Sequence, residues 1–380
     1  MAVRVRLNNP RVLKWARDEM GLDLEEVAHY LKRTPDVIEA WENGEEQPTY
    51  RQLEALATKL KRPLAAFFLP SVPASAELPS DNRTTPTRGP GVYGPESRLA
   101  FRLVRNMLAD TRELLEELRW RVTYRLPTWR QGDDLDGAAA EVRELLGITV
   151  DAQMREMRSH YAALDAWREV LFDQGIVVRI CQMPIDDVRA FCLMGDGLGG
   201  IGLCSEERVQ GRIFSLFHEV CHLGIQQPGA SGLVGRGGPS PSTNQQLEDY
   251  CDKFAAAFLM PATDPEVRSA LHSLAGELTL GTARRVAKSF KVSKYVAARR
   301  AKDLGYVSSD AYWSEIEDWL IEDRTKRKKA SGGNYVATQI SSVGRSFLTL
   351  VLSAMNGGAI TSADASRLTG LSAAAVQEVA

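Results

Sequence analysis

Two histidines and a glutamate stand close together in FSLFHEVCHLGI, residues 214–225. His218 and His222 are four residues apart and Glu219 follows the first of them, which is the H-E-x-x-H pattern. On a helix, side chains at i and i+4 lie on one face, so both imidazoles can bind one zinc ion. Glu219 could then act as the general base on a nearby water. The alternative is a core helix that carries two hydrogen-bonded histidines.

A catalytic zinc site needs a third protein ligand. The next acidic residues after His222 lie in NQQLEDYCDKFAAAFLMP, residues 244–261. Glu248 and Asp252 are one helical turn apart there, so they share a face. Glu248 can supply the third ligand, and Asp252 can accept the other ring N–H of a ligating histidine. The alternative is that the pair forms a solvated helix face.

Both segments have the sequence pattern of helices. The first is apolar around its histidines, and Gly224 can end it. The second has an N-cap candidate in Asn244 and a stop at Pro261. An apolar stripe with a period of 3.6 residues runs through it and includes Cys251. Two helices that carry polar groups among core positions therefore frame the predicted metal site.

Residues 175–183 and 188–204 are predicted to be strands, the second divided by a tight turn at Asp196-Gly197. A sheet edge near the metal site could bind a substrate as an added strand, and a purely structural sheet is the alternative. Residues 226–244 are rich in glycine and proline. They are predicted to form a mobile loop between the two motif helices, which is either a gate over the site or a disordered linker.

Together, GRIFSLFHEVCHL and LEDYCDKFAAAFLMP resemble the ImmA/IrrE family of zinc metallo-endopeptidases, over roughly residues 160–300. This resemblance implies Zn²⁺ as the cofactor. It also implies roles for particular residues: His218, His222 and Glu248 as zinc ligands, Glu219 as the general base, and Asp252 as the second-motif Asn/Asp that supports a ligand. The chain has Cys204 where the family usually has Asn at the end of the strand before the first motif helix.

The first 70 residues have the pattern of a small helical domain. Five helices are predicted, at residues 10–20, 24–32, 35–43, 50–60 and 63–68. Residues 23–60 resemble the Xre-type helix-turn-helix, which implies operator DNA as a partner. The residues expected to contact DNA are Arg11, Lys14, Arg17, Lys32, Arg33 and Thr34.

The charge of the predicted recognition helix opposes DNA binding. It carries Asp36, Glu39 and Glu42, whereas neutralisation of phosphates supplies most non-specific affinity for DNA. Flanking basic residues would have to compensate. The alternative is a module that serves homodimerisation or recognises a protein partner.

The composition is that of an ordinary soluble protein, with 44% hydrophobic and 25% charged residues and a net charge of −2. No apolar run has the length of a membrane span and no secretory signal is visible, so no membrane partner is expected. The five cysteines are odd in number and scattered. This favours reduced thiols and a cytoplasmic location.

The predicted fold class is α+β and mostly helical, with a five-helix domain, a gluzincin-like metallopeptidase domain that holds a small antiparallel sheet, and a helical tail. The predicted boundaries are 1–70 for the helix-turn-helix, 71–95 for a linker, 96–322 for the peptidase with its N-terminal helical portion, 323–334 for a basic tether and 335–380 for the tail. Eight Lys and Arg lie between Arg284 and Lys302. They are expected to complete the peptidase domain, and a nucleic-acid surface is the alternative.

The expected function is zinc-dependent cleavage of a specific regulatory protein, coupled to transcriptional regulation. The family resemblance implies a cognate repressor or toxin as substrate, in a stress, phage-related or toxin–antitoxin setting. The alternative is a non-catalytic Xre-family regulator or antitoxin whose peptidase fold senses a partner. An intact set of His218, Glu219, His222 and Glu248 favours the enzyme, because a binding fold does not need a general base.

Overall fold

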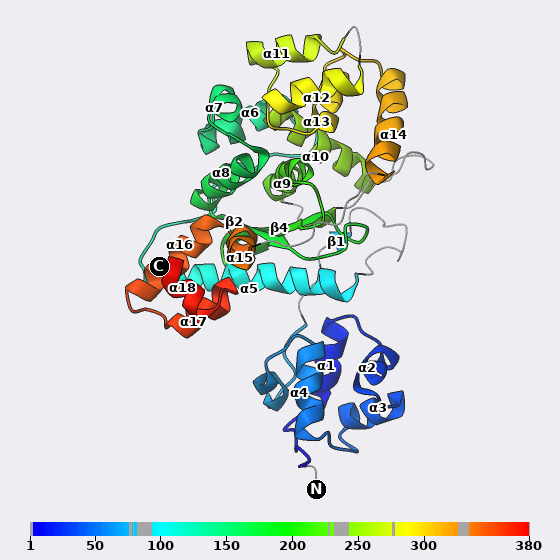
Figure 1. Ribbon diagram of the computed structural model, residues 1–380, viewed down its shortest axis with the longest axis vertical. Helices are drawn as coiled ribbons and strands as arrows, with labels where there is room; N and C mark the ends of the chain where they lie inside the picture. The colour runs from blue at the N-terminus through cyan, green and yellow to red at the C-terminus, as the bar shows by residue number, and fades with distance from the viewer. Residues whose placement is uncertain are drawn as a thin grey trace. The chain divides into compact units, whose positions relative to one another are not determined.

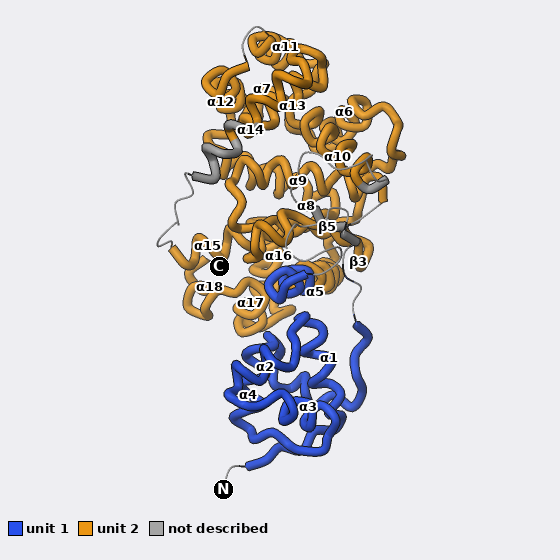
Figure 2. The backbone as a smooth tube through the Cα atoms, turned by 90° about the vertical axis from the view of Figure 1, so that its right-hand side faces the viewer, with its two compact units in different colours: residues 1–78, 87–102 blue, residues 79–86, 103–380 orange. Residues whose placement is uncertain are grey.

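The computed structural model forms two compact units (Figure 2): unit 1, residues 1–78 and 87–102, and unit 2, residues 79–86 and 103–380. It describes residues 3–75, 78, 80–81, 93–226, 229–231, 243–275, 278–325 and 334–379. Most of the predicted loop 226–244 lies outside the described residues. So do residues 82–92 of the predicted linker and residues 326–333 of the predicted tether.

Unit 1 has the five helices that the sequence predicted. They are α1 (Arg11–Glu19), α2 (Leu24–Leu31), α3 (Pro35–Asn43), α4 (Tyr50–Lys59) and a final 3-10 helix, η1 (Leu64–Phe68). Capping boxes begin α2 and α4, with Asp23 and Thr49 as N-caps. Apolar residues from every helix form one core, with Trp41 and Phe67 almost fully buried. Local capping and an amphipathic pattern therefore account for the positions of these helices.

A mixed sheet lies at the centre of unit 2, with strand order β1-β5-β3-β4-β2. Its main strands are β2 (Ile176–Cys181), β3 (Ala190–Gly195) and β4 (Leu198–Cys204), and two short strands, β5 (Gly229–Ser231) and β1 (Ser80–Asp81), extend it. Asp196 and Gly197 both have positive φ, which confirms the predicted tight turn between β3 and β4.

The prediction of an antiparallel sheet is only partly correct. β3 runs antiparallel to β4 and β5, but β2 runs parallel to β4. Residues 182–189 connect β2 to β3 past the end of β4, so β4 is inserted between two strands that are consecutive in sequence. Such a crossover depends on tertiary packing and has no local signal in the sequence.

Helices cover both faces of the sheet (Figure 1). The glycines of β4 allow a close approach, because a Cβ on Gly200 would lie 2.8 Å from Val104 of α5 (Pro95–Glu117) and one on Gly199 would lie 3.2 Å from Leu223 of α9 (Val209–Gly224). The other helices before the tail are α6 (Leu135–Leu146), α7 (Val150–Arg155), α8 (His160–Asp173), α10 (Thr243–Leu259), α11 (Pro265–His272), α12 (Leu280–Ser289), α13 (Lys294–Asp303) and α14 (Ser309–Thr325).

The C-terminal helices pack on α5 and on the edge of the sheet. They are α15 (Tyr335–Val343), α16 (Arg345–Asn356), α17 (Ser362–Thr369) and α18 (Ala373–Val379), and they share a hydrophobic core with α5. The hydroxyl of Ser342 donates a hydrogen bond to the carbonyl of Ile180 in edge strand β2, at 2.8 Å. Buried Arg168 donates to the carbonyls of Val178 and Ser341, at 2.7 and 2.6 Å. The tail therefore covers the outer edge of β2.

No helix in the described part of the chain combines the length and the apolar character that a membrane crossing requires.

Candidate metal centre

The two motif helices, α9 and α10, lie side by side in the core of unit 2. Phe217 of α9 stacks on Phe258 of α10, with ring centroids 3.9 Å apart. Trp167 of α8 packs edge-on against both rings. This apolar packing holds the two helices together at the turns that carry the polar motif residues.

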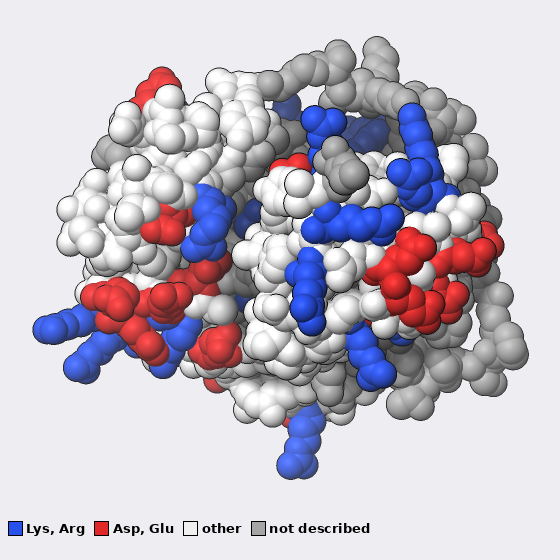
Figure 3. Space-filling model, turned by 90° about the horizontal axis from the view of Figure 1, so that it is seen from below, with Lys and Arg blue, Asp and Glu red and all other residues white. Residues whose placement is uncertain are grey.

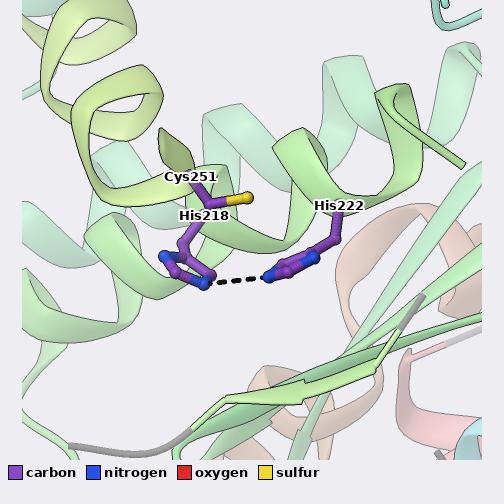
Figure 4. Close-up of side chains that lie close together, drawn as sticks. All are labelled: His218, His222 and Cys251. Carbon is purple, nitrogen blue, oxygen red and sulfur yellow. Dashed lines mark hydrogen bonds between the residues drawn. The ribbon is translucent and has the colours of Figure 1, made fainter. Parts of the chain in front are cut away.

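Three of the predicted site residues converge at this place. His218 Nε2 and His222 Nε2 are 3.1 Å apart (Figure 4). The two carboxylate oxygens of Glu248 lie 3.1 Å from His218 Nε2 and 3.2 Å from His222 Nε2. The exposed fraction is 3% for His218 and 0% for His222 and Glu248. The solvated helix face that was the alternative for Glu248 is therefore excluded.

These donor atoms fit a zinc ion. Tetrahedral zinc holds nitrogen and oxygen ligands at about 2.0–2.2 Å, which places ligand atoms about 3.3–3.6 Å from one another. The separations of 3.1–3.2 Å among His218, His222 and Glu248 are close to this spacing. A dication would also balance the buried carboxylate, which is costly to desolvate on its own.

A further potential ligand, the thiol of Cys251, was not singled out from the sequence. The ligand atoms of His218, His222 and Cys251 all lie within 4.8 Å of one another. Figure 4 shows these three side chains gathered between α9 and α10. Cys251 is three residues after Glu248 on α10, and this spacing was the available signal. Glu248 reaches both imidazoles, with its carboxylate oxygens 3.1 and 3.2 Å from Nε2 of His218 and of His222, and its negative charge would balance a bound cation. Glu248 is therefore the stronger candidate for the third ligand.

Asp252 lies where the sequence analysis expected a supporting carboxylate. Its Oδ1 is 2.9 Å from Nδ1 of His218. A carboxylate at this distance accepts the Nδ1–H bond and so selects the tautomer that leaves Nε2 free to bind a metal. Glu219, next to His218 on α9, is fully buried. Cys204 lies at the end of β4, where its buried thiol donates to the carbonyl of Met183 at 3.1 Å.

Unit 1 requires a correction to the predicted DNA contacts. Arg17 is buried, and its Nε and Nη2 donate to the two carboxylate oxygens of Glu42, at 2.7 and 2.9 Å. Its Nη1 donates to the carbonyl of Leu22 at 3.0 Å. Arg17 therefore joins α1 to α3 inside the domain and is not available to a phosphate. Glu42 is likewise removed from the acidic face of α3, where Asp36 and Glu39 remain exposed.

The remaining predicted DNA-contact residues are exposed: Arg11, Lys14, Lys32, Arg33 and Thr34. Lys14 pairs with Asp18 at 2.9 Å on the surface of α1. On the face of the molecule in Figure 3, basic and acidic side chains lie next to one another. The surface of unit 1 therefore keeps basic residues that could approach phosphates, although α3 itself contributes two acidic ones.

The basic residues of α13 are buried or half-buried, whereas Arg284, Arg285 and Lys288 of α12 are exposed. Lys294, Arg299 and Arg300 are each at most 9% exposed. Arg300 donates to the carbonyl of Met260 at 3.0 Å and pairs with Asp136 of α6. These contacts tie α13 to α10 and α6, in agreement with the expectation that this segment completes the peptidase domain.

Comparison with known protein families identifies both parts of the chain. Residues 173–302 match the model of the IrrE N-terminal-like domain, a peptidase family, and residues 13–67 match a helix-turn-helix model. A comparison with curated proteins found no match, and a comparison with solved structures found none either. The chain thus has a helix-turn-helix segment followed by an IrrE-like peptidase segment, and the resemblance read from the motifs is confirmed.

Proposed function

We propose that this chain is a zinc-dependent endopeptidase that cleaves a specific regulatory protein and is coupled to transcriptional control. The observation that carries the proposal is the convergence of His218, His222 and Glu248, within 3.1–3.2 Å of one another in a buried place beside Glu219. A set of two imidazoles and one carboxylate is typical of catalytic rather than structural zinc sites.

Each of these residues would have a different role in peptide hydrolysis. A bound zinc ion supplies Lewis acidity toward the scissile carbonyl and makes a water molecule more acidic. Glu219 accepts the proton of the attacking water and passes it to the leaving amine. Asp252 keeps His218 in the tautomer that presents Nε2. The apolar shell around Phe217 keeps bulk water away from these charges.

The substrate that best suits this architecture is a cognate repressor or toxin. A helix-turn-helix segment in the same chain couples proteolysis to an operator, in a stress, phage-related or toxin–antitoxin setting. We assign DNA binding to exposed basic residues of unit 1, chiefly Arg11, Lys14, Lys32 and Arg33. With Asp36 and Glu39 exposed on α3, binding would be weak and strongly dependent on salt.

Proteome-wide identification of new protein N-termini tests the proteolytic activity. Cells that encode the chain would carry either the wild-type protein or Glu219→Gln, in which the amide cannot accept the proton of water. We expect a small set of N-termini, from one or few proteins, that appear only with the wild-type protein. If the two strains yield the same N-termini under every inducing stress, the non-catalytic regulator is the better account.

A further inference from the structure

The carboxylate that supports His218 is itself held by an arginine from a third helix. Asp252 directs Oδ1 to His218 Nδ1 at 2.9 Å, and its Oδ2 lies 3.5 Å from Nη1 of Arg299 in α13. The exposed fraction of the side chain is 16% for Asp252 and 11% for Arg299. An ion pair so far from solvent is weakly screened, so its geometry has a larger effect than that of a surface pair.

The guanidinium of Arg299 is fixed from several directions. Its Nε donates to both carboxylate oxygens of Asp303, one turn later on α13, at 3.2 and 3.1 Å. Its Nη2 donates to Oδ1 of Asp249 on α10 at 2.5 Å. With Nε and Nη2 engaged in this way, Nη1 is the group that faces Asp252. A planar guanidinium can serve three carboxylates in a fixed arrangement, which a lysine ammonium cannot do.

We infer that Arg299 is a positioning residue for the metal centre, which acts through Asp252 to orient His218. The chain of contacts runs from Arg299 Nη1 to Asp252 Oδ2, and from Asp252 Oδ1 to His218 Nδ1. This inference rests on the proposed zinc site. If the inference holds, α13, which lies outside both sequence motifs, contributes to zinc affinity. Arg299, one of the basic residues at 284–302, then has a defined role.

Arg299 also joins α13 to α10 through Asp249, so a loss of zinc binding alone would not separate positioning from folding. A double-mutant cycle makes the separation, because a residue that acts only through Asp252 has no effect once Asp252 cannot respond. The measured quantity is the dissociation constant of Zn²⁺ for the full chain, obtained by competition with a chelator. The melting temperature of the metal-free protein is recorded for every variant.

We expect Asp252→Asn to weaken zinc binding by about 10- to 100-fold, the usual effect of removing a carboxylate behind a ligating histidine. Arg299→Gln should weaken it by about tenfold, at the lower end of that range because it acts one contact further out. In the Asp252→Asn background, Arg299→Gln should produce no further loss. Lys253→Gln is the matched control: Lys253 also pairs with Asp249, at 2.8 Å, but is 45% exposed, and its loss should leave zinc affinity unchanged.

Wild-type zinc affinity in Arg299→Gln, or losses that multiply in the double variant, would overturn the inference. If Arg299→Gln does not fold, Arg299→Lys takes its place in the cycle. Lysine keeps the positive charge, so Arg299→Lys should weaken zinc binding by less than tenfold. This effect should again be absent in the Asp252→Asn background. His218→Ala separates this inference from the proposed function. If His218→Ala still binds zinc, the proposed metal site is wrong. If His218→Ala loses zinc but Arg299→Gln binds it with wild-type affinity, only the role of Arg299 is wrong.

Discussion

Replacing Arg17 by alanine should leave the buried carboxylate of Glu42 in unit 1 without its positively charged partner. The two side chains are 10% and 5% exposed and share two hydrogen bonds, at 2.7 and 2.9 Å. Removing one partner of a buried ion pair typically costs about 3–5 kcal/mol, because an uncompensated charge remains away from water. The lost bond from Arg17 to the carbonyl of Leu22 adds about 1 kcal/mol. A small helical domain has little more stability than this in total.

Amide hydrogen exchange of peptides from α1 to α3 measures the effect within the full chain. Slow amides of these helices should exchange roughly 900- to 25,000-fold faster in Arg17→Ala, the equivalent of the summed loss of about 4–6 kcal/mol. Lys14→Ala is the matched control on the same helix. Its ion pair with Asp18 is exposed, with side chains 58% and 49% accessible, so its loss should change exchange by less than about fivefold.

A second variant tests the cause of the instability. Arg17→Met combined with Glu42→Leu removes both charges and keeps apolar volume, so it should recover most of the lost protection. If Arg17→Ala exchanges no faster than Lys14→Ala, the pair does not stabilise the domain. If instead Arg17→Ala stays folded and reduces the salt dependence of DNA binding, the assignment of Arg17 to the interior is wrong.

Three further predictions concern the candidate metal centre, the proposed DNA-binding surface and the core. Glu219→Gln should retain zinc and the wild-type melting temperature but lose cleavage, so cleavage near the wild-type rate would remove Glu219 as the general base. Arg11→Ala should flatten the slope of log K against log salt concentration for an upstream duplex by about 0.9, and an unchanged slope would mean that Arg11 touches no phosphate. Gly224→Ala should lower stability by about 1–3 kcal/mol in thermal unfolding, because its Cβ would overlap the ring of Trp129. Gly281→Ala, on a helix with no atom closer than 3.8 Å to the new Cβ, should not destabilise the protein.

Local signals in the sequence predicted most of the fold. Capping residues and apolar periods located the helices of unit 1 to within one residue at every end, and Asp196-Gly197 located the β3–β4 turn. The parallel pairing of β2 with β4 could not be predicted in this way. Which strand occupies the middle of a sheet depends on the burial of both faces, here between α5 and α9, and not on any turn.

The convergence of His218, His222 and Glu248 could be predicted because helical periodicity and motif spacing place them on facing sides of α9 and α10. The interior position of Arg17 was also visible in principle. Together with Leu13, Ala16 and Met20 it follows the i, i+3, i+4, i+7 pattern of the buried face of α1. The positive charge of Arg17 favours an exposed position, but the carboxylate of Glu42 on α3 balances it inside the domain. The contact of Arg299 with Asp252 has no such signal, because it depends on how α13 packs against α10.

The zinc content of two variants on one helix tests the central claim most directly. Purified wild-type protein should contain one zinc ion per chain, bound by His218, His222 and Glu248. Glu248→Ala should lose that zinc on dialysis, because its carboxylate oxygens lie 3.1 and 3.2 Å from the two imidazole nitrogens. Cys251→Ala, one turn along α10, should keep it. Full zinc retention by Glu248→Ala together with its loss from Cys251→Ala would contradict this account and make the thiol the third ligand.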